Sequence, residues 1–251
     1  TIPVMLDYCR IIEEVAPDAW LLNYTNPMAM ITGAILKATG VKTVGLCHSV
    51  QGCASHLCWE LGLPNDNLKW KIAGINHQGW LLEISRNGED LYPEIKRRAQ
   101  LDEYVHKDTV RFELMKRFGY YVTESSEHTS EYVPWFIKSR APELIDRFHI
   151  PLDEYPRRCR DQIKGWNGMR EYLLSDQPLD HERGGEYASY IFEAMETGVP
   201  FTLGGNVLNK NLITNLPFDA CVEVMCVVDR NGVTPTHVGD LPPQCAALTR
   251  T

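Results

Sequence analysis

The first 61 residues alternate between amphipathic and uniformly apolar stretches. Ile2, Met5, Cys9 and Ile12 recur at three- and four-residue spacing, which predicts a helix over 2–15. The same pattern predicts strands over 19–23 and 41–47 and helices over 28–39 and 50–61. Helices and strands that alternate with short connections are typical of right-handed crossovers and a parallel sheet.

The pattern changes after this region. Residues 68–84 have the character of strands, and Asn87-Gly88 is a strong signal for a tight hairpin turn. Helical stretches are predicted over 94–118, 154–174 and 183–197, and strands over 200–207 and 219–229, with a second hairpin at Asn231-Gly232. We therefore expect an α/β protein. Residues 1–47 would be the closing part of a Rossmann-type parallel sheet, and residues 48–251 an α+β domain packed on it.

One element of a dinucleotide-binding domain is missing from the sequence. Such a domain normally begins with a strand, a Gly-x-Gly turn and a helix whose N-terminus binds the pyrophosphate. Gly184-Gly185 and Gly204-Gly205-Asn206 do not open a helix after a strand, so we interpret both as backbone turns. The chain begins at Thr1 with neither an initiator Met nor a signal pattern. We expect it to be an interior piece of a longer protein.

Composition narrows the class of protein. Of 251 residues, 44% are apolar and 23% charged, which is typical of a globular domain with a sizeable core. Acidic residues outnumber basic ones 33 to 25, which argues against a nucleic-acid partner, because phosphate contacts need a dense basic face. No apolar run approaches the roughly 18 residues that span a bilayer, so no membrane association is expected.

The eight cysteines are irregularly spaced. Without an export signal, reduced thiols in a cytoplasmic protein are the simplest interpretation. Cys53-x2-His56-x-Cys58 suggests a zinc site, but two cysteines five positions apart on a helix point about 140° apart. We therefore favour buried thiols at Cys53 and Cys58.

Polar residues follow three of the predicted strands, where open α/β sheets bind their ligands. They are Asn26, the pair Cys47-His48, and the pair Asn76-His77. A thiolate and an imidazole from two strand ends suit a borderline divalent metal. The alternatives are a turn residue before proline for Asn26 and an unrelated Cys and His for the other two pairs.

Residues 120–132 place serines, glutamates and a histidine among aromatic side chains. Such a segment could hold a general base with a tuned pKa. The same serines could equally cap the start of a helix.

Together, in this order, these motifs resemble glycoside hydrolase family 4, and within it most closely the α-galactosidases of the melibiose type. The resemblance extends over the whole chain. The matching segments are Asn23–Met30, Gly45–Gly52, Gly74–His77, Val122–His128, Glu131–Phe136, Pro151–Pro156, Asn215–Pro217 and Cys221–Val224. It implies a lactate/malate-dehydrogenase-like Rossmann domain with an α+β partner. The glycine-rich turn would precede Thr1, and further helices would follow Thr251.

The resemblance also implies a reaction. An α-galactoside such as melibiose, the small-molecule partner, would be cleaved with NAD and Mn²⁺ or another divalent metal as cofactors. The sugar is oxidised at C3, the glycosidic oxygen is eliminated across C1–C2, water adds at C1, and the ketone is reduced again. The full-length enzyme would be a homo-oligomer, and the isolated piece would be inactive.

Other activities stay open from the sequence. An α-glucosidase or α-galacturonidase of the same family would share these motifs. A 2-hydroxy-acid dehydrogenase would share the Rossmann half, but should show a catalytic Asp–His pair and substrate arginines. A non-catalytic sugar-binding fragment is the remaining alternative.

The resemblance assigns roles to five residues at the strand ends. Cys47 and His77 would bind the metal, and His48 would be the general acid toward the leaving group. Asn26 would contact the sugar close to the nicotinamide of the cofactor, and Asn76 would also contact the substrate.

The catalytic base is less well defined, because the family uses Tyr or Asp and neither aligns cleanly with the segment around 124–132. His128 and Glu127 are the candidates. Arg183 could reach a substrate hydroxyl, with a charge on a helix surface as the alternative.

Overall fold

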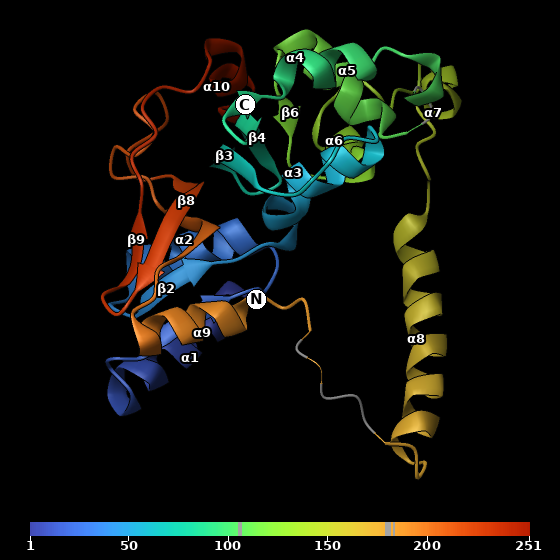
Figure 1. The fold of residues 1–251 in the computed structure, drawn as a ribbon. Helices are drawn as coiled ribbons and strands as arrows, with labels where there is room; N and C mark the ends of the chain where they lie inside the picture. Colours follow the sequence, from blue (N-terminus) through green and yellow to red (C-terminus); the bar gives the residue numbers. More distant parts are fainter. Residues whose placement is uncertain (105–106, 179–181, 183) are drawn as a thin grey trace.

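A computed structural model describes residues 1–104, 107–178, 182 and 184–251. Its strands form one mixed sheet in the order β1-β2-β7-β8-β3-β4-β5, with β6 paired to β4 and β9 paired to β8 (Figure 1). The strands are β1 Trp20–Asn23, β2 Lys42–Gly45, β3 Leu68–Ile75, β4 Gln78–Arg86, β5 Glu89–Asp90, β6 Tyr121–Val122, β7 Phe201–Leu208, β8 Cys221–Asp229 and β9 Gly232–Pro235.

Helices cover this sheet and extend beyond it. They are α1 Ile2–Val15, α2 Met28–Ala38, α3 His48–Glu60, α4 Tyr92–Arg98, the 3₁₀ turn η1 Asp102–Tyr104, α5 Thr109–Phe118, α6 Ser126–Tyr132, α7 Glu143–Arg147, α8 Glu154–Leu173, α9 Ala188–Thr197 and α10 Pro243–Thr249. Among the described residues, no helix is long and apolar enough to cross a membrane.

The N-terminal region has the predicted parallel pair. β1 and β2 run parallel from Trp20↔Lys42 to Asn23↔Gly45, and α1 and α2 bury a small apolar cluster of Cys9, Ile31 and Ile35 beside them. The next strand in the sheet is β7, which is antiparallel to β2. The remaining strand pairs are also antiparallel, so among the strands of the described chain only β1 and β2 pair in parallel.

Both predicted hairpins are present. Asn87 and Gly88 have φ of 52° and 87°, as a two-residue turn of this kind requires, and Arg86 pairs with Glu89. The second hairpin joins β8 to β9, with Asp229 opposite Gly232.

Three predicted elements were wrong in detail. The helix expected over 94–118 is interrupted by η1, and α5 begins only after Asp108, whose φ of 38° cannot continue a helix. The helix expected from 183 begins at Ala188. Gly204-Gly205 is not a turn but lies inside β7, where a Cβ on Gly204 would come within 2.5 Å of Val50.

Two strands from the end of the chain lie in the middle of the sheet. β7 and β8 separate β2 from β3, so the sheet continues past position 47 without a break. Because one sheet contains strands from both sides of position 47, the strands mark no boundary there, and the expected domain boundary stays a prediction.

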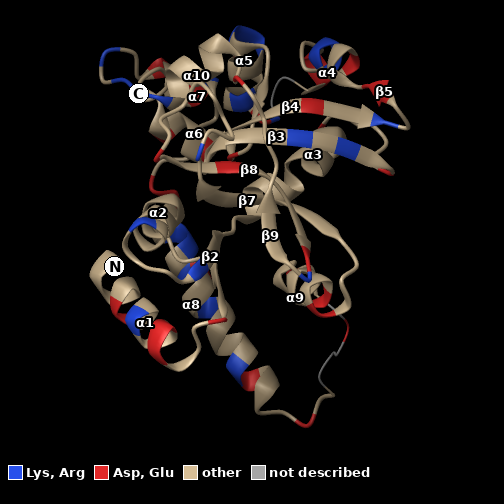
Figure 2. Ribbon diagram, turned by 90° about the vertical axis from the view of Figure 1, so that its left-hand side faces the viewer, with Lys and Arg blue, Asp and Glu red and all other residues tan. Residues whose placement is uncertain are grey.

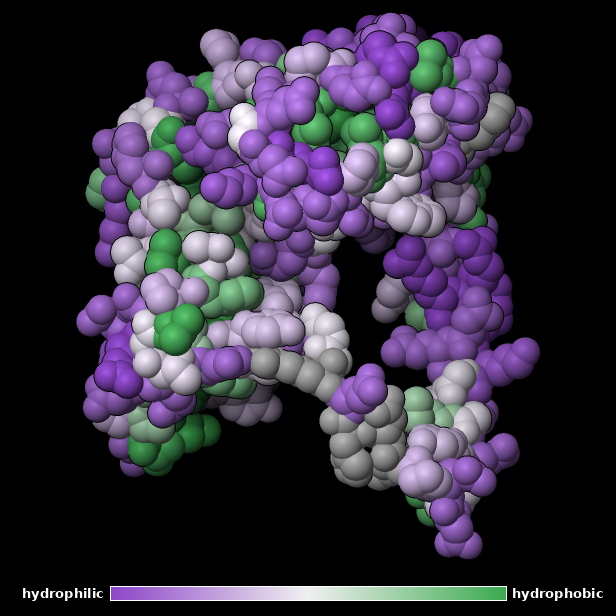
Figure 3. Space-filling model, viewed as in Figure 1, coloured by the Kyte–Doolittle hydropathy of each residue, from purple (hydrophilic) through white to green (hydrophobic). Residues whose placement is uncertain are grey.

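The arrangement in space separates α8 from the rest. Figure 1 shows α8 standing away from the sheet, and the space-filling view in Figure 3 shows open space between this helix and the body. Every residue of α8 is at least partly exposed. Basic and acidic residues are interspersed along α8 in Figure 2.

Candidate metal and acid-base site

Cys47 lies where β2 passes into α3. It is the N-cap residue of α3, with extended backbone angles. Its Sγ lies 3.1 Å from the hydroxyl of Ser49. Burial raises the pKa of the Cys47 thiol, and the hydrogen bond with Ser49 opposes that shift.

His77 reaches the same place from a tight turn. Ile75 of β3 pairs with Gln78 of β4, so Asn76 and His77 form a two-residue connection. His77 has φ of 65°, a left-handed conformation that costs of order 1–3 kcal/mol for a residue other than glycine. Backbone strain of this kind is concentrated at functional sites.

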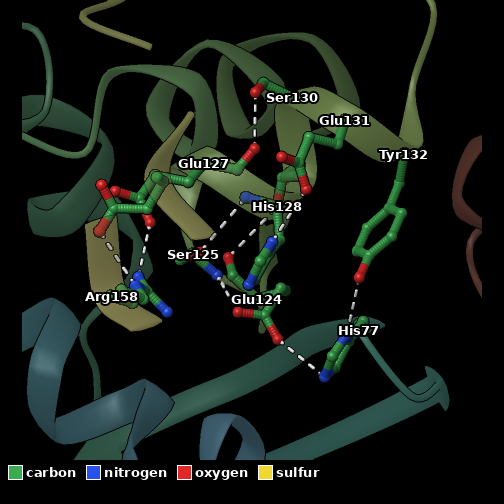
Figure 4. A network of polar contacts seen from close by, with 11 residues as sticks. His77, Glu124, Ser125, Glu127, His128, Ser130, Glu131, Tyr132 and Arg158 are labelled. Atoms are coloured by element: carbon green, nitrogen blue, oxygen red, sulfur yellow. Dashed lines mark hydrogen bonds and ion pairs between the residues drawn. The ribbon is translucent and has the colours of Figure 1, made fainter. Parts of the chain in front are cut away.

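The third side chain is Glu124, in the segment between β6 and α6. The backbone N–H of Thr123 donates to the carbonyl oxygen of Gly79, which fixes this segment against β4. Glu124 is only 7% exposed. One carboxylate oxygen accepts from the Ser125 backbone N–H at 2.7 Å, and the other lies 3.1 Å from Nε2 of His77 (Figure 4).

These three side chains converge. Donor atoms of Cys47, His77 and Glu124 all lie within 4.8 Å of one another, and in the described part of the chain they are the group of three that could hold a metal ion. Sulfur, imidazole nitrogen and carboxylate oxygen suit a borderline divalent ion such as Mn²⁺, Fe²⁺ or Zn²⁺. The residues present therefore fit a metal site.

Two side chains of α6 surround His77. Nδ1 of His77 lies 3.0 Å from the hydroxyl of Tyr132, which leaves Nε2 toward Glu124 (Figure 4). A ligating His commonly uses its second nitrogen in this way, which fixes the orientation of the ring. The ring of His128 stacks almost parallel to His77, with centroids 6.2 Å apart, while Nδ1 of His128 contacts Glu131 at 2.9 Å.

His48 belongs to a second group beside Cys47. Its Nε2 lies 2.8 Å from Glu186, and the other oxygen of Glu186 accepts from the hydroxyl of Tyr24 at 2.7 Å. The hydrogen bonds from Tyr24 and then from His48 lower the pKa of Glu186. The hydroxyl of Tyr187 donates to the carbonyl oxygen of Cys47 at 3.1 Å, so this group is tied to the metal-site strand.

Other predicted site residues lie apart from the three donors. Glu127 makes an ion pair with Arg158 at 2.9 Å, on the side of α6 away from His77 (Figure 4). Oδ1 of Asn26 accepts from the Met28 backbone N–H at 3.2 Å, which is the turn role, while the residue itself is exposed. Arg183 lies outside the described residues.

The segment 120–132 contains both a helix cap and side chains that contact His77. The hydroxyl of Ser125 accepts from the His128 backbone N–H at 3.3 Å and caps α6. The capping interpretation is therefore confirmed. The same helix start brings Glu124 and His128 to His77.

The zinc pattern in α3 has a different outcome. Cys53 and Cys58 are 2% and 0% exposed and lie in an apolar cluster, whereas His56 is exposed. Burial raises the pKa of Cys53 to about 11. Both thiols therefore behave as small core side chains, and all eight cysteines of the chain are free.

Sequence reasoning missed three side chains of this region. Glu124, Tyr132 and Glu186 contact His77 or His48, yet none was assigned a role. Glu124 and Tyr132 lay inside the polar segment already singled out, but nothing in their spacing separates them from its other glutamates and tyrosines.

Comparison with known families covers nearly the whole chain. The profile of family 4 glycosyl hydrolases matches residues 1–63, and that of the family 4 glycosyl hydrolase C-terminal domain matches residues 72–251. An α-galactosidase of Bacillus subtilis (strain 168) is 60% identical over 252 residues, which cover 100% of this chain and 58% of that protein. An α-galactosidase of Rhizobium meliloti (strain 1021) is 38% identical, covering 98% and 52%. The chain thus spans a little over half the length of these relatives.

Solved structures share the fold. The lplD protein of Bacillus subtilis superposes with a TM-score of 0.85 at 24% identity, covering 99% of this chain and 62% of that one. A 6-phospho-alpha-glucosidase from gut microorganisms, in complex with NAD and Mn²⁺, has a TM-score of 0.70 at 21% identity, covering 99% and 60%.

The dehydrogenase resemblance of the fold is also confirmed. A malate dehydrogenase of Plasmodium falciparum, in complex with NADH, has a TM-score of 0.54 at 10% identity, covering 98% of this chain and 65% of that one. The Rossmann-type α/β architecture expected from the sequence is therefore correct. With two family profiles matching residues 1–63 and 72–251, the chain belongs to family 4 of the glycosyl hydrolases.

Proposed function

We propose that the protein to which this chain belongs is an α-galactosidase that uses NAD and a divalent metal such as Mn²⁺. The observation that carries the proposal is the convergence of a thiol, an imidazole and a carboxylate at Cys47, His77 and Glu124. The 60% identity to an α-galactosidase supports the choice of sugar. The NAD and Mn²⁺ bound by the 6-phospho-alpha-glucosidase support the cofactors.

The metal would be held by Cys47 and His77, with Glu124 added to the pair expected from the sequence. A bound metal would supply Lewis-acid polarisation of neighbouring sugar oxygens. NAD would supply the oxidation and re-reduction of the sugar ring. Cys47 must lose its proton to act as a ligand, and Tyr132 would hold the His77 ring in its ligating orientation.

His48 would be the general acid toward the leaving group. Its side chain is 65% exposed and can therefore meet a substrate, while Glu186 and Tyr24 restrict its orientation. The contact with Glu186 fixes which way Nε2 of the ring points.

His128 would be the base that removes the proton from C2 of the sugar. It stacks beside the ligating His77, whereas the alternative, Glu127, is paired with Arg158. The ion pair holds the Glu127 carboxylate on the side of α6 away from His77, which favours His128 over Glu127.

Sugar hydroxyls would be contacted by Asn26 and Asn76. The amide nitrogen of Asn76 is buried, which limits its proposed contact to the side-chain oxygen. Asn26 is exposed and follows the end of β1, the kind of position at which open α/β sheets bind their ligands.

The test measures hydrolysis of an aryl α-galactoside by the full-length protein with NAD, Mn²⁺ and a thiol reductant. We expect turnover to require both cofactors, and deuterium at C2 to slow it, because elimination breaks that C–H bond. Aryl α-glucoside and α-galacturonide are the matched controls for the sugar. Cofactor-independent cleavage with no isotope effect would assign the protein instead to the glycosidases that use two carboxylates.

A further inference from the structure

A row of paired residues crosses five strands directly beneath the metal-site residues. Gly45 of β2 pairs with Asn206 of β7, which pairs with Glu223 of β8. Glu223 pairs in turn with Gly74 of β3, which pairs with Gly79 of β4. The two polar residues of the row are thus flanked by glycines. The chain passes from this row to Cys47 and His77 within three residues, and Thr123, next to Glu124, is bonded to Gly79 of the row.

Glu223 is a carboxylate inside the protein. It is 0% exposed, and one of its oxygens accepts from Nδ2 of Asn206 at 2.9 Å. The other oxygen, Oε2, has no hydrogen-bond partner among the described residues. A Cβ on Gly79 would lie 3.0 Å from this oxygen, so the glycine leaves room for the carboxylate.

A buried donor without a partner lies close by. Nδ2 of Asn76 is buried and, within the described chain, forms no hydrogen bond. Asn76 follows Gly74, the residue opposite Glu223, by two positions, at the start of the turn between β3 and β4. The turn that carries His77 therefore continues directly from the residue opposite the buried carboxylate, and it holds a buried donor without a partner.

Such a carboxylate needs an explanation. A buried anion with one unpaired oxygen is destabilising, and a neutral side chain of similar volume is often neutral or stabilising in its place. A divalent cation bound by Cys47, His77 and Glu124 would be attracted to the Glu223 carboxylate, and this attraction would explain why a carboxylate is kept in the core.

We propose that Glu223 is a positioning residue of the metal site, where its carboxylate, held by Asn206, anchors Asn76 and the His77 turn and supplies negative charge beneath the bound cation. The inference rests on the metal site of the proposed function. It assigns Glu223 a contact with the supporting turn and no contact with substrate.

The test measures Mn²⁺ binding to the full-length protein by calorimetry, without NAD or substrate, for Glu223→Gln and the matched control Glu83→Gln. Glu83 is an exposed carboxylate on the same sheet, paired with Lys71. We expect Mn²⁺ affinity to fall about 10–100-fold for Glu223→Gln, as for other residues that support metal ligands, and to stay unchanged for Glu83→Gln. The metal-free melting temperature of Glu223→Gln should equal or exceed that of the wild type, because the substitution removes a buried charge.

A purely structural Glu223 would give the reverse, with a lower metal-free melting temperature and unchanged Mn²⁺ affinity, and that result would overturn the inference. Asn76→Ala tests it again without altering the core, and should also weaken Mn²⁺ binding. Unchanged affinity for Asn76→Ala would contradict the anchoring role.

The outcomes also separate this inference from the proposed function. Normal turnover of α-galactoside by the wild type with unchanged Mn²⁺ binding by Glu223→Gln refutes the inference alone. Weakened Mn²⁺ binding by Glu223→Gln in a protein that cleaves no α-galactoside supports the inference and refutes the function. A wild type that binds no Mn²⁺ overturns both.

Discussion

Two sets of cysteine and histidine residues in this molecule differ in what they form. Cys47 and His77 are 30 positions apart, yet their donor atoms lie within 4.8 Å of each other and of a carboxylate. Cys53, His56 and Cys58 lie within six positions of one helix, yet two of them are buried in the core and one is exposed. Proximity in the sequence is thus a poor guide to a site here.

The physical reason is the direction in which the backbone projects side chains. Residues two or five positions apart on a helix, such as His56 and Cys58 or Cys53 and Cys58, point to different sides. Strands of a sheet instead place side chains through their order and register, which brings residues far apart in the sequence together. Cys47 follows β2 and His77 follows β3, and the carboxylate of Glu124 follows β6.

Removal of the Cys47 thiol should have the largest effect on metal binding and turnover. We expect Cys47→Ser in the full-length protein to abolish NAD- and Mn²⁺-dependent turnover and to weaken Mn²⁺ binding by more than about 100-fold, since a serine hydroxyl is a far poorer ligand than a thiolate. Calorimetry and the aryl α-galactoside assay measure the two effects. Cys159→Ser, on the exposed helix α8, is the control and should leave both unchanged. Undiminished turnover in Cys47→Ser would remove Cys47 from the metal site.

The carboxylate should have the next largest effect. We expect Glu124→Gln to weaken Mn²⁺ binding about 10–100-fold, because the amide keeps the volume but loses the charge beside His77. Glu143→Gln on α7 replaces an exposed carboxylate and should leave the affinity unchanged. Equal affinities for the two variants would restrict the protein ligands to Cys47 and His77.

Substitution of Cys53 or Cys58 on α3 should lower stability without affecting metal binding. We expect Cys53→Ala or Cys58→Ala to lower the free energy of unfolding by about 1–2 kcal/mol through a small cavity, without changing Mn²⁺ affinity. Denaturant unfolding measures the stability, and the exposed His56→Ala serves as a control with little effect. Zn²⁺ binding that disappears in all three variants would show that the trio is a site after all.

Local interactions account for what the sequence predicted well. The helix over 2–15 has the expected bounds, because its apolar spacing repeats over four turns. The turn at Asn87-Gly88 forms because both residues tolerate positive φ. The strand ends before Cys47 and His77 were found for a similar reason, since apolar runs that stop at polar residues mark the edge of a sheet.

Long-range contacts decided the rest. Gly204-Gly205 lies inside β7 because Val50 and Cys226 pack against it from other elements, and no local pattern distinguishes such glycines from a turn. Glu124 reaches His77 because Thr123 is bonded to Gly79, in a strand more than 40 positions earlier.

By itself, the sequence determined the type of each long element, the strand ends that present Cys47 and His77, and the family. Only the tertiary structure decided which glutamate joins them, which face of α6 is turned toward them, and that a buried Glu223 lies beneath them. Secondary structure follows from spacing along the chain, whereas a site of this kind follows from the order and register of strands, which places residues far apart in sequence in contact.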